Sequence, residues 1–157
     1  MNSDPCLYMT FKLGDELFAI PVAQVREVLE ITTITHVPGA PEYMRGLVNV
    51  RGKAIPVVDL RLRFGLPEGV ETVNSRIVVM ELDIEGETVI LGGLADSVQE
   101  VIEIEPSQVQ PAPRLGMRWK QEFIHGVSRR GDAFLILLDL QALFAGEEIA
   151  LAAGPAC

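Results

Sequence analysis

The sequence has few of the residues on which disulfide frameworks and metal sites depend. It contains two cysteines, Cys6 and Cys157, one near each end of the chain, and two histidines. Two cysteines placed in this way form no disulfide framework, and they fit a protein of the reducing cytosol. The histidines, His36 and His125, lie 89 residues apart with no cluster of ligand-type side chains beside either. The sequence therefore predicts no metal site.

Long hydrophobic runs and positive charge are also absent. No stretch approaches the 18 or more apolar residues that a transmembrane helix needs. The N-terminus has no basic region followed by an apolar core, so we expect no signal peptide. The net charge is -9 and the isoelectric point is about 4.7, which argues against a general nucleic-acid-binding protein, because such proteins need a basic surface.

Catalytic motifs are missing as well. Gly46–Lys53 superficially resembles a phosphate-binding loop, but five residues separate its glycines instead of four, and Ala54 stands where a metal-binding Ser or Thr is required. No Ser-His-Asp arrangement is apparent. The sequence favours a protein that is not an enzyme and needs no cofactor. The alternative is acid–base chemistry by a set of glutamates that is repeated along the chain: Glu27, Glu30, Glu100 and Glu103.

The chain does contain an internal repeat. Residues 46–64 match residues 126–144, and three pairs lie 80 positions apart: Gly46 with Gly126, Asp59 with Asp139, and Phe64 with Phe144. Gly52 matches Gly131 at 79, which predicts that one residue was gained or lost between the copies. Residues 27–31 similarly match residues 100–104. Two copies of about 70 residues predict two similar small units that share an interface.

The local pattern is mostly that of β-strands. Residues 8–13 alternate and residues 16–21 run apolar, on either side of a turn at Gly14-Asp15. Residues 76–84 and 87–94 flank a similar turn, so each copy is expected to begin with a hairpin. A second hairpin is expected over residues 46–58, and one helical turn leading into a strand over residues 22–30. Asp59 and Asp139 stand where helix N-caps are expected, and residues 140–153 predict a terminal helix.

Two features of the first copy need a physical interpretation. Pro56 lies in a strong strand pattern, and because proline cannot donate to a ladder it is expected at an edge or a bulge. Arg45–Arg63 contains five basic residues and one acid in an otherwise acidic chain. This segment is either a solvated loop or a docking site for an acidic protein surface.

The motif Asn49-Val-Arg-Gly-Lys-Ala-Ile-Pro-Val-Val-Asp-Leu-Arg61 resembles the CheW family of bacterial chemosensory adaptors. So do the segments FKLGDELFAIPVAQVREV, VPGAPEYMRGLVNVRG and QVQPAP, and the resemblance covers residues 8–146. It implies an all-β fold of two pseudo-symmetric five-stranded β-barrels packed over a hydrophobic seam, with short helices and a C-terminal helix. The barrels are expected at about 14–72 and 76–144, with an exchange of strands left open, followed by a tail at 147–157.

The resemblance also implies a function without catalysis or cofactors. A family member binds the cytoplasmic tips of chemoreceptors and the regulatory domain of the histidine kinase CheA, which has the same fold. It is a cytoplasmic protein that is recruited to receptor arrays and does not insert into the membrane. Two alternatives remain: an adaptor of a pilus-motility, gliding or surface-sensing pathway, and, more distantly, a small enzyme that uses the glutamate set.

Site residues follow from the resemblance position by position. Arg51 resembles the family's receptor-contacting arginine, and Asn49, Ile77 and Val98 are expected to line the same groove. Two other sets are expected to face the kinase: an edge formed by Val25, Glu27 and Val28, and an opposite loop formed by Pro111, Arg114 and Leu115. The sequence departs from the family at Arg114-Leu115, where an acidic or aromatic residue is common, so the chemistry of that contact is left open.

Overall fold

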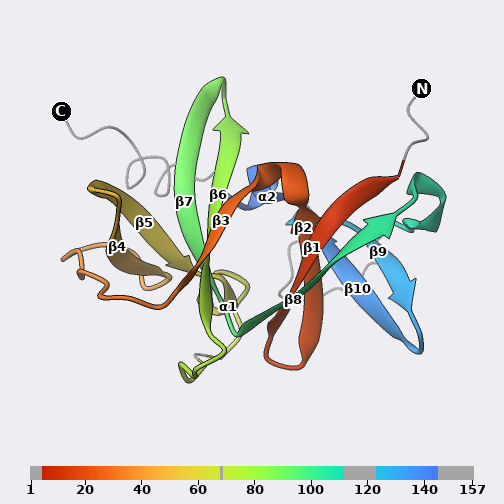
Figure 1. Ribbon diagram of the computed structural model, residues 1–157, viewed down its shortest axis with the longest axis horizontal. Helices are drawn as coiled ribbons and strands as arrows, with labels where there is room; N and C mark the ends of the chain where they lie inside the picture. The colour runs from red at the N-terminus through yellow and green to blue at the C-terminus, as the bar shows by residue number, and fades with distance from the viewer. Residues whose placement is uncertain (1–4, 68, 112–122, 145–157) are drawn as a thin grey trace.

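The computed structural model describes residues 5–67, 69–111 and 123–144, and two curled five-stranded sheets make up most of it (Figure 1). We call them sheet A, with the strand order β8-β1-β2-β10-β9, and sheet B, with the order β3-β6-β7-β5-β4. Short helices lie between strands. The all-β prediction of two packed five-stranded units is thereby confirmed.

The strands of sheet A are β1 (Cys6–Leu13), β2 (Glu16–Pro21), β8 (Ser97–Ile104), β9 (Ile124–Arg130) and β10 (Ala133–Leu138). Those of sheet B are β3 (Val25–Glu30), β4 (Met44–Val50), β5 (Lys53–Asp59), β6 (Arg76–Ile84) and β7 (Glu87–Ala95). The helical turns are η1 (Val22–Gln24), α1 (Leu60–Arg63), η2 (Pro106–Gln108) and α2 (Leu140–Leu143). The turn at η1 leads into β3 as the sequence predicts.

Each sheet combines strands from both copies of the repeat. The hairpin β1–β2 pairs with β8 and β10 of the second copy, and the hairpin β6–β7 pairs with β3 and β5 of the first. In Figure 1 the red N-terminal hairpin therefore lies beside the blue C-terminal strands, and the green hairpin lies beside the orange and yellow strands. The sheets do not coincide with the expected units 14–72 and 76–144, because the hairpins are exchanged.

The two copies are equivalent in three dimensions. Gly46 pairs with Val57 in sheet B, and Gly126 pairs with Leu137, 80 positions later, in sheet A. The amide of Asp59 donates to the carbonyl of Tyr43 at 2.7 Å, and that of Asp139 donates to the carbonyl of Phe123 at 2.9 Å. The positions that match in the sequence therefore occupy matching places in the ladders.

The predicted gain or loss of a residue between Gly52 and Gly131 is wrong. Val50 pairs with Lys53 and Arg130 pairs with Ala133, so both hairpins have two-residue loops and keep the offset of 80 throughout. Glycine occupies the second loop position in one copy and the first in the other. The first position has positive φ in both copies, 51° at Arg51 and 62° at Gly131.

β5 lies between β7 and β4, so Pro56 is not in an edge strand, but it occupies a position of β5 that is locally an edge on the β7 side. Pro56 is paired with Leu47, whose amide and carbonyl both bond to Thr35 at 2.8 Å and thus point away from β5. The ladder to β7 begins only at Val57. Neither neighbour therefore requires an N–H from residue 56, and proline is tolerated in an inner strand.

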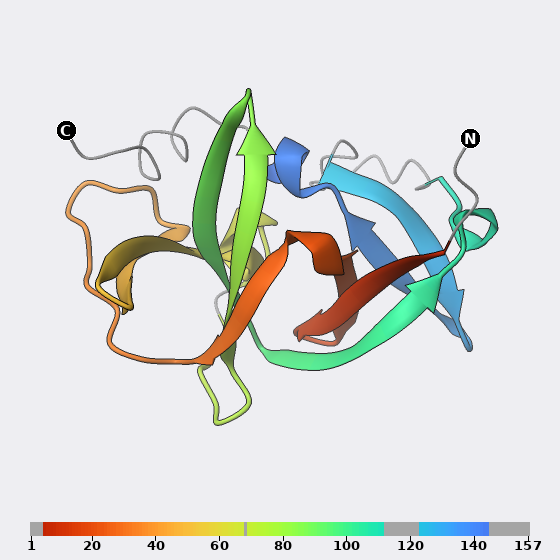
Figure 2. The ribbon, with the colours of Figure 1, turned by 45° about the horizontal axis from the view of Figure 1, so that its top comes forward.

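The apolar residues form one core between the sheets and a smaller core inside each sheet. The shared core contains Met9, Phe11 and Phe18 of sheet A together with Val78, Met80 and other residues of sheet B. The rings of Phe11, Phe18 and Phe64 stack with centroid separations of 5.9 and 5.6 Å. Figure 2 shows the two sheets on either side of this seam. The expected hydrophobic seam is therefore present.

Aspartate caps start both short α-helices. The side chain of Asp59 accepts hydrogen bonds from the amides of Arg61 at 3.0 Å and Leu62 at 3.4 Å, and Asp139 accepts one from Ala142 at 3.1 Å. Both predicted N-caps are confirmed. Of the predicted terminal helix over residues 140–153, only α2 lies among the described residues.

Replacing Asp59 by alanine is expected to lower the free energy of unfolding by about 1–2 kcal/mol, since a cap bonded to two amides is lost. The side chain is buried, 5% exposed, and its other oxygen lies 3.7 Å from Arg45. Asp139→Ala is the matched control and should cost less, about 1 kcal/mol. Urea denaturation of both variants measures the difference, and a smaller loss for Asp59→Ala than for Asp139→Ala would contradict the assignment.

Candidate protein-binding surface

An apolar surface lies where the shared core reaches solvent. Val25 of β3 and Val98 of β8 pack against the shared core, and they pair with the core residues Met80 and Phe11. Paired residues lie on the same face of a sheet. Two residues expected from the family resemblance at separate surfaces, one for the kinase and one for the receptor, therefore lie on faces that meet the same core.

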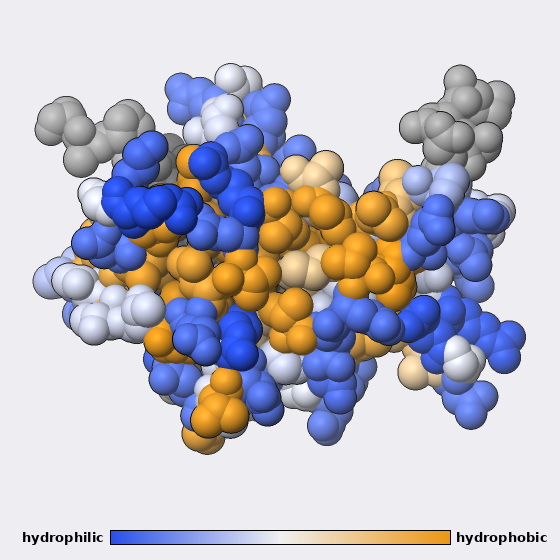
Figure 3. Space-filling model, viewed as in Figure 1, coloured by the Kyte–Doolittle hydropathy of each residue, from blue (hydrophilic) through white to orange (hydrophobic). Residues whose placement is uncertain are grey.

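Three exposed apolar side chains extend this surface. Val28 is 39% exposed and pairs with Val78, while Val101 is 55% exposed and pairs with Met9; both partners belong to the shared core. Leu7 is 53% exposed and lies two residues from Met9, on the same face of β1. We call these five residues, Leu7, Val25, Val28, Val98 and Val101, the seam face. Figure 3 shows apolar atoms gathered over the middle of the molecule between hydrophilic flanks.

The hairpin tip of β4–β5 carries Arg51. The amide of Gly52 donates to Oδ1 of Asn49 at 2.7 Å, which holds the two-residue turn and gives Asn49 a structural role. Arg51 has a positive φ of 51°, and its side chain is 69% exposed. Its guanidinium binds Glu27 of β3 through both carboxylate oxygens, with Nη1 lying 3.1 Å from Oε1.

This ion pair joins two residues that were predicted to bind different partners. The hydrogen bond from Arg51 holds the pKa of Glu27 below its ordinary value, against an opposing effect of burial. Because that pKa is lowered, any stability that the pair contributes is present above the ordinary carboxylate pKa and is lost as the pH falls through the lowered one. At neutral pH the pair is charged, and the predicted receptor and kinase residues are in direct contact.

Sheet A has a matching ion pair. Arg130, at the tip of the hairpin β9–β10, lies 2.8 Å from Glu100 of β8. In sheet B an arginine of the hairpin β4–β5 thus binds a glutamate of the edge strand β3, and in sheet A an arginine of the hairpin β9–β10 binds a glutamate of the edge strand β8. Arg26 and Glu81 form a further exposed pair at 2.6 Å. Charged pairs therefore occupy the strands that carry the seam face.

The other predicted site residues are placed differently. Ile77 has no exposed surface and packs inside sheet B with Val57 and Val79, so a partner cannot touch it, and its predicted place in a groove is corrected. Pro111 is exposed and borders a cavity of about 440 Å³. Arg114 and Leu115 lie outside the described residues.

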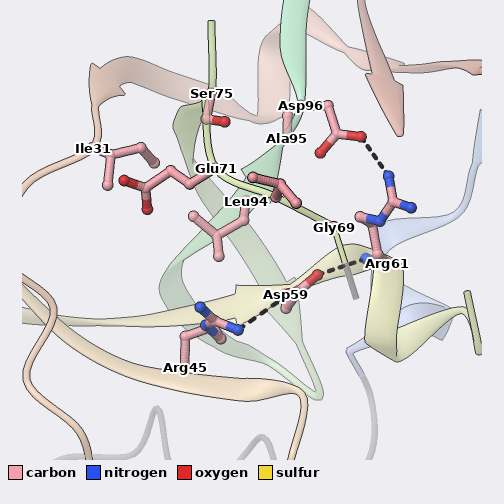
Figure 4. Close-up of a pocket in the computed structure, with 11 residues that line it drawn as sticks. Ile31, Arg45, Asp59, Arg61, Gly69, Glu71, Ser75, Leu94, Ala95 and Asp96 are labelled. Carbon is pink, nitrogen blue, oxygen red and sulfur yellow. Dashed lines mark hydrogen bonds and ion pairs between the residues drawn. The ribbon is translucent and has the colours of Figure 1, made fainter. Parts of the chain in front are cut away.

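The basic segment Arg45–Arg63 is mostly bound within the molecule. Figure 4 shows Arg45 facing Asp59, at 3.7 Å, and Arg61 facing Asp96, at 2.5 Å, around a small pocket. The guanidinium of Arg63 lies 5.2 Å from the Tyr43 ring centroid and 4.9 Å from that of Phe123. With Arg51 bound to Glu27, four of the five basic side chains already have partners. The hypothesis of a basic docking site is therefore not supported.

The glutamate set does not converge. Glu27 is bound to Arg51 and Glu100 to Arg130, on different sheets. Within the part of the chain that the structure describes, no three His, Cys, Asp or Glu side chains lie close enough to share a metal ion. Over the same residues, no helix has the length and apolar character required to span a bilayer.

Sequence reasoning missed Leu7 and Val101 as surface residues. For Val101 the available signal was the alternation of its strand: it lies between Glu100 and Ile102 and has the opposite parity to Ile102 and Ile104. Such a residue in an alternating strand faces away from the sheet's own core, and here that direction leads to the seam.

Comparisons with known proteins agree with these features. The family described as the CheW-like domain matches residues 7–148. The chain is 32% identical to the chemotaxis protein CheW of Treponema pallidum over 95% of this chain and 88% of that one. It is 30% identical to the protein PilI of Pseudomonas aeruginosa, over 80% and 68%. The crystal structure of the scaffolding protein TtCheW from Thermoanaerobacter tengcongensis superposes with a TM-score of 0.80 at 33% identity, covering 92% of this chain and 90% of that one.

Proposed function

The chain belongs to the CheW-like domain family, and on this basis we propose that it is a non-enzymatic adaptor that couples chemoreceptors to a CheA-type histidine kinase. It would act in the cytoplasm and be recruited to receptor arrays at the membrane. The observation that carries the proposal is the seam face, an apolar surface on the edge strands β3 and β8 and on the adjoining strand β1, with ion pairs on β3 and β8.

A chemoreceptor tip is a helical hairpin, and an apolar surface between two sheets suits a helix that buries its apolar face there. We propose that Val98, on the sheet A side of the seam face, supplies this contact, with Arg51 and Asn49 at its border. An arginine at the border of an apolar contact adds charge-assisted hydrogen bonds that fix orientation.

The kinase contact is proposed at the open edge of sheet B. β3 is an edge strand, and Val25, Glu27 and Val28 lie on it. Edge strands offer unpaired backbone groups and suit a partner of the same fold. A second kinase contact is proposed at the loop that begins near Pro111. Arg114 and Leu115, which were predicted to take part in it, lie outside the described residues.

A second candidate is an adaptor of a pilus-associated chemosensory pathway, which the similarity to PilI favours. The two candidates share the proposed surfaces and differ in the receptor and kinase that are bound. Titrating the chain against the receptor tips and kinase regulatory domains of both pathways in its own cell distinguishes them.

A Val28→Lys change should weaken kinase binding by about 2 kcal/mol or more, roughly thirtyfold, because a charge must be desolvated at an apolar contact. Val73→Lys is the matched control: Val73 is 88% exposed in the connection between β5 and β6, away from the ladders. Calorimetric titration with the kinase regulatory domain should show the loss only for Val28→Lys. Undiminished affinity of a folded Val28→Lys variant would count against the kinase assignment.

A further inference from the structure

The hairpins of the two halves of the chain are exchanged through very short connections. From β2 the chain crosses from sheet A to sheet B within the three residues of η1, and from β7 it crosses back at Asp96. The connection between the halves, residues 65–75, is longer, and its Val70 and Val73 are 85% and 88% exposed. The short connections fix the exchange. The long one packs Leu66 against the shared core and offers the Pro67 carbonyl to Arg61 at 2.9 Å, and after Pro67 it serves to join the halves.

Contacts between the halves are reciprocal. Arg61 of the first half binds Asp96 of the second at 2.5 Å, and Gln141, 80 positions after Arg61, accepts from Gln24 of the first half at 3.4 Å. Each contact joins a short helix of one half, α1 after β5 or α2 after β10, to the crossover connection of the other half, at Asp96 or in η1. Arg63 also donates to the carbonyl of Leu143, 80 residues later, at 3.0 Å. Reciprocal contacts of this kind are the mark of a two-fold dimer interface.

Removing one half would leave the other without a sheet. In sheet B, the borrowed strands β6 and β7 lie between β3 and β5, so without them β3 would have no ladder and β4–β5 would be a lone hairpin. In sheet A, β1 and β2 separate β8 from β10 in the same way. A two-stranded hairpin is marginal in water on its own. Figures 1 and 2 show each borrowed hairpin between strands of the other half.

We propose that the protein is an internally swapped dimer of one repeating unit, in which residues before and after the 65–75 connection are obligate partners that fold only together. The covalent link between Val70 and Glu71 is then dispensable for the fold. The first half offers the space between β3 and β5, which the hairpin β6–β7 of the second half occupies. The second half offers the space between β8 and β10, which the hairpin β1–β2 of the first half occupies.

The test uses the full chain with a protease recognition sequence inserted between Val70 and Glu71. After cleavage, the two fragments should elute together at the size of the uncut protein and keep its circular dichroism. Their association becomes bimolecular, so the melting temperature should fall with dilution of the cleaved protein and stay constant for the uncut variant.

Separating the fragments in urea provides the second measurement. When urea is removed from each fragment by itself, the fragment should stay unfolded. When urea is removed from an equimolar mixture, the mixture should regain the circular dichroism spectrum that the uncut variant regains after the same treatment. Cooperative refolding of either fragment alone as a monomer would overturn the proposal. So would separation of the fragments on cleavage without denaturant, or a mixture that fails to refold while the uncut variant succeeds.

Discussion

Gly46→Ala is expected to lower the free energy of unfolding by more than about 3 kcal/mol, a large loss for one methyl group. Gly46 has φ of 143°, and a Cβ there would overlap the carbonyl oxygen of Thr35. That oxygen accepts from the Leu47 amide in the bridge that joins the segment after β3 to β4. The substitution therefore has to break the bridge between Thr35 and Leu47 or distort β4.

Gly86→Ala separates the two causes. Gly86 also has a positive φ, 83°, but a Cβ there meets nothing within 4 Å, so only backbone strain of about 1 kcal/mol is expected. Gly126, the equivalent of Gly46, would place a Cβ 2.7 Å from the Gln110 carbonyl oxygen and should also be costly. Equal losses of unfolding free energy for Gly46→Ala and Gly86→Ala in urea denaturation would show that the clash with the Thr35 carbonyl oxygen does not add to the cost at position 46.

Phe18→Ala is expected to cost about 3–5 kcal/mol, because a fully buried ring is replaced by a cavity. Phe18 is 0% exposed in β2 and stacks between Phe11 of its own sheet and Phe64, which follows α1. The loss should appear in a single cooperative unfolding transition, since the shared core belongs to both sheets.

The matched control is Phe134→Ala, in β10 of the same sheet. Phe134 is 51% exposed, so its truncation should cost less than about 1 kcal/mol. Chemical denaturation of both variants provides the comparison. Two separate transitions in the Phe18→Ala variant, one for each sheet, would contradict the shared core.

The local elements were predictable from the sequence because each has a local cause. The hairpins follow from the strand patterns on both sides of the turns Gly14-Asp15 and Glu85-Gly86, and the caps follow from Asp59 and Asp139 ahead of apolar helical turns. The repeat predicted two similar units. These signals depend on neighbours within a few residues and need no knowledge of pairing.

Register was less predictable. The match of residues 27–31 with 100–104 pairs Leu29 with Ile102, yet Leu29 faces Ile77 and Ile104 faces Cys6. Cys6 is the equivalent of Ile77, because the turn of the hairpin β1–β2 at Gly14-Asp15 matches that of β6–β7 at Glu85-Gly86, 71 positions later. The structural counterpart of Leu29 is therefore Ile104. A slip of two residues keeps every side chain on the same face, so alternation alone cannot detect it.

Burial of Ile77 escaped prediction for a related reason. Both faces of β6 are apolar, with Ile77 and Val79 inside sheet B and Val78 and Met80 toward the seam. Periodicity cannot distinguish a face that is covered by its own sheet from one that meets another sheet. The Arg51–Glu27 contact likewise spans 24 residues and depends on the curl of sheet B.

The most direct test of the proposed function is a paired titration of Arg51→Ala against a chemoreceptor tip and a kinase regulatory domain, with Arg130→Ala as control. Arg130 lies in the equivalent hairpin of sheet A, one residue before the position that matches Arg51, and it also pairs with a glutamate of an edge strand, Glu100. Both variants should stay folded and change stability by only about 0.5 kcal/mol, as exposed ion pairs do.

If Arg51 contacts the receptor, Arg51→Ala should weaken receptor binding by about 1–3 kcal/mol, roughly tenfold to a hundredfold, through loss of a charge-assisted hydrogen bond. Kinase binding should persist, with at most a small loss where Glu27 is freed, and Arg130→Ala should bind the receptor as the unchanged protein does. Equal loss of both partners, loss of neither, or an equal effect of Arg130→Ala would contradict the account.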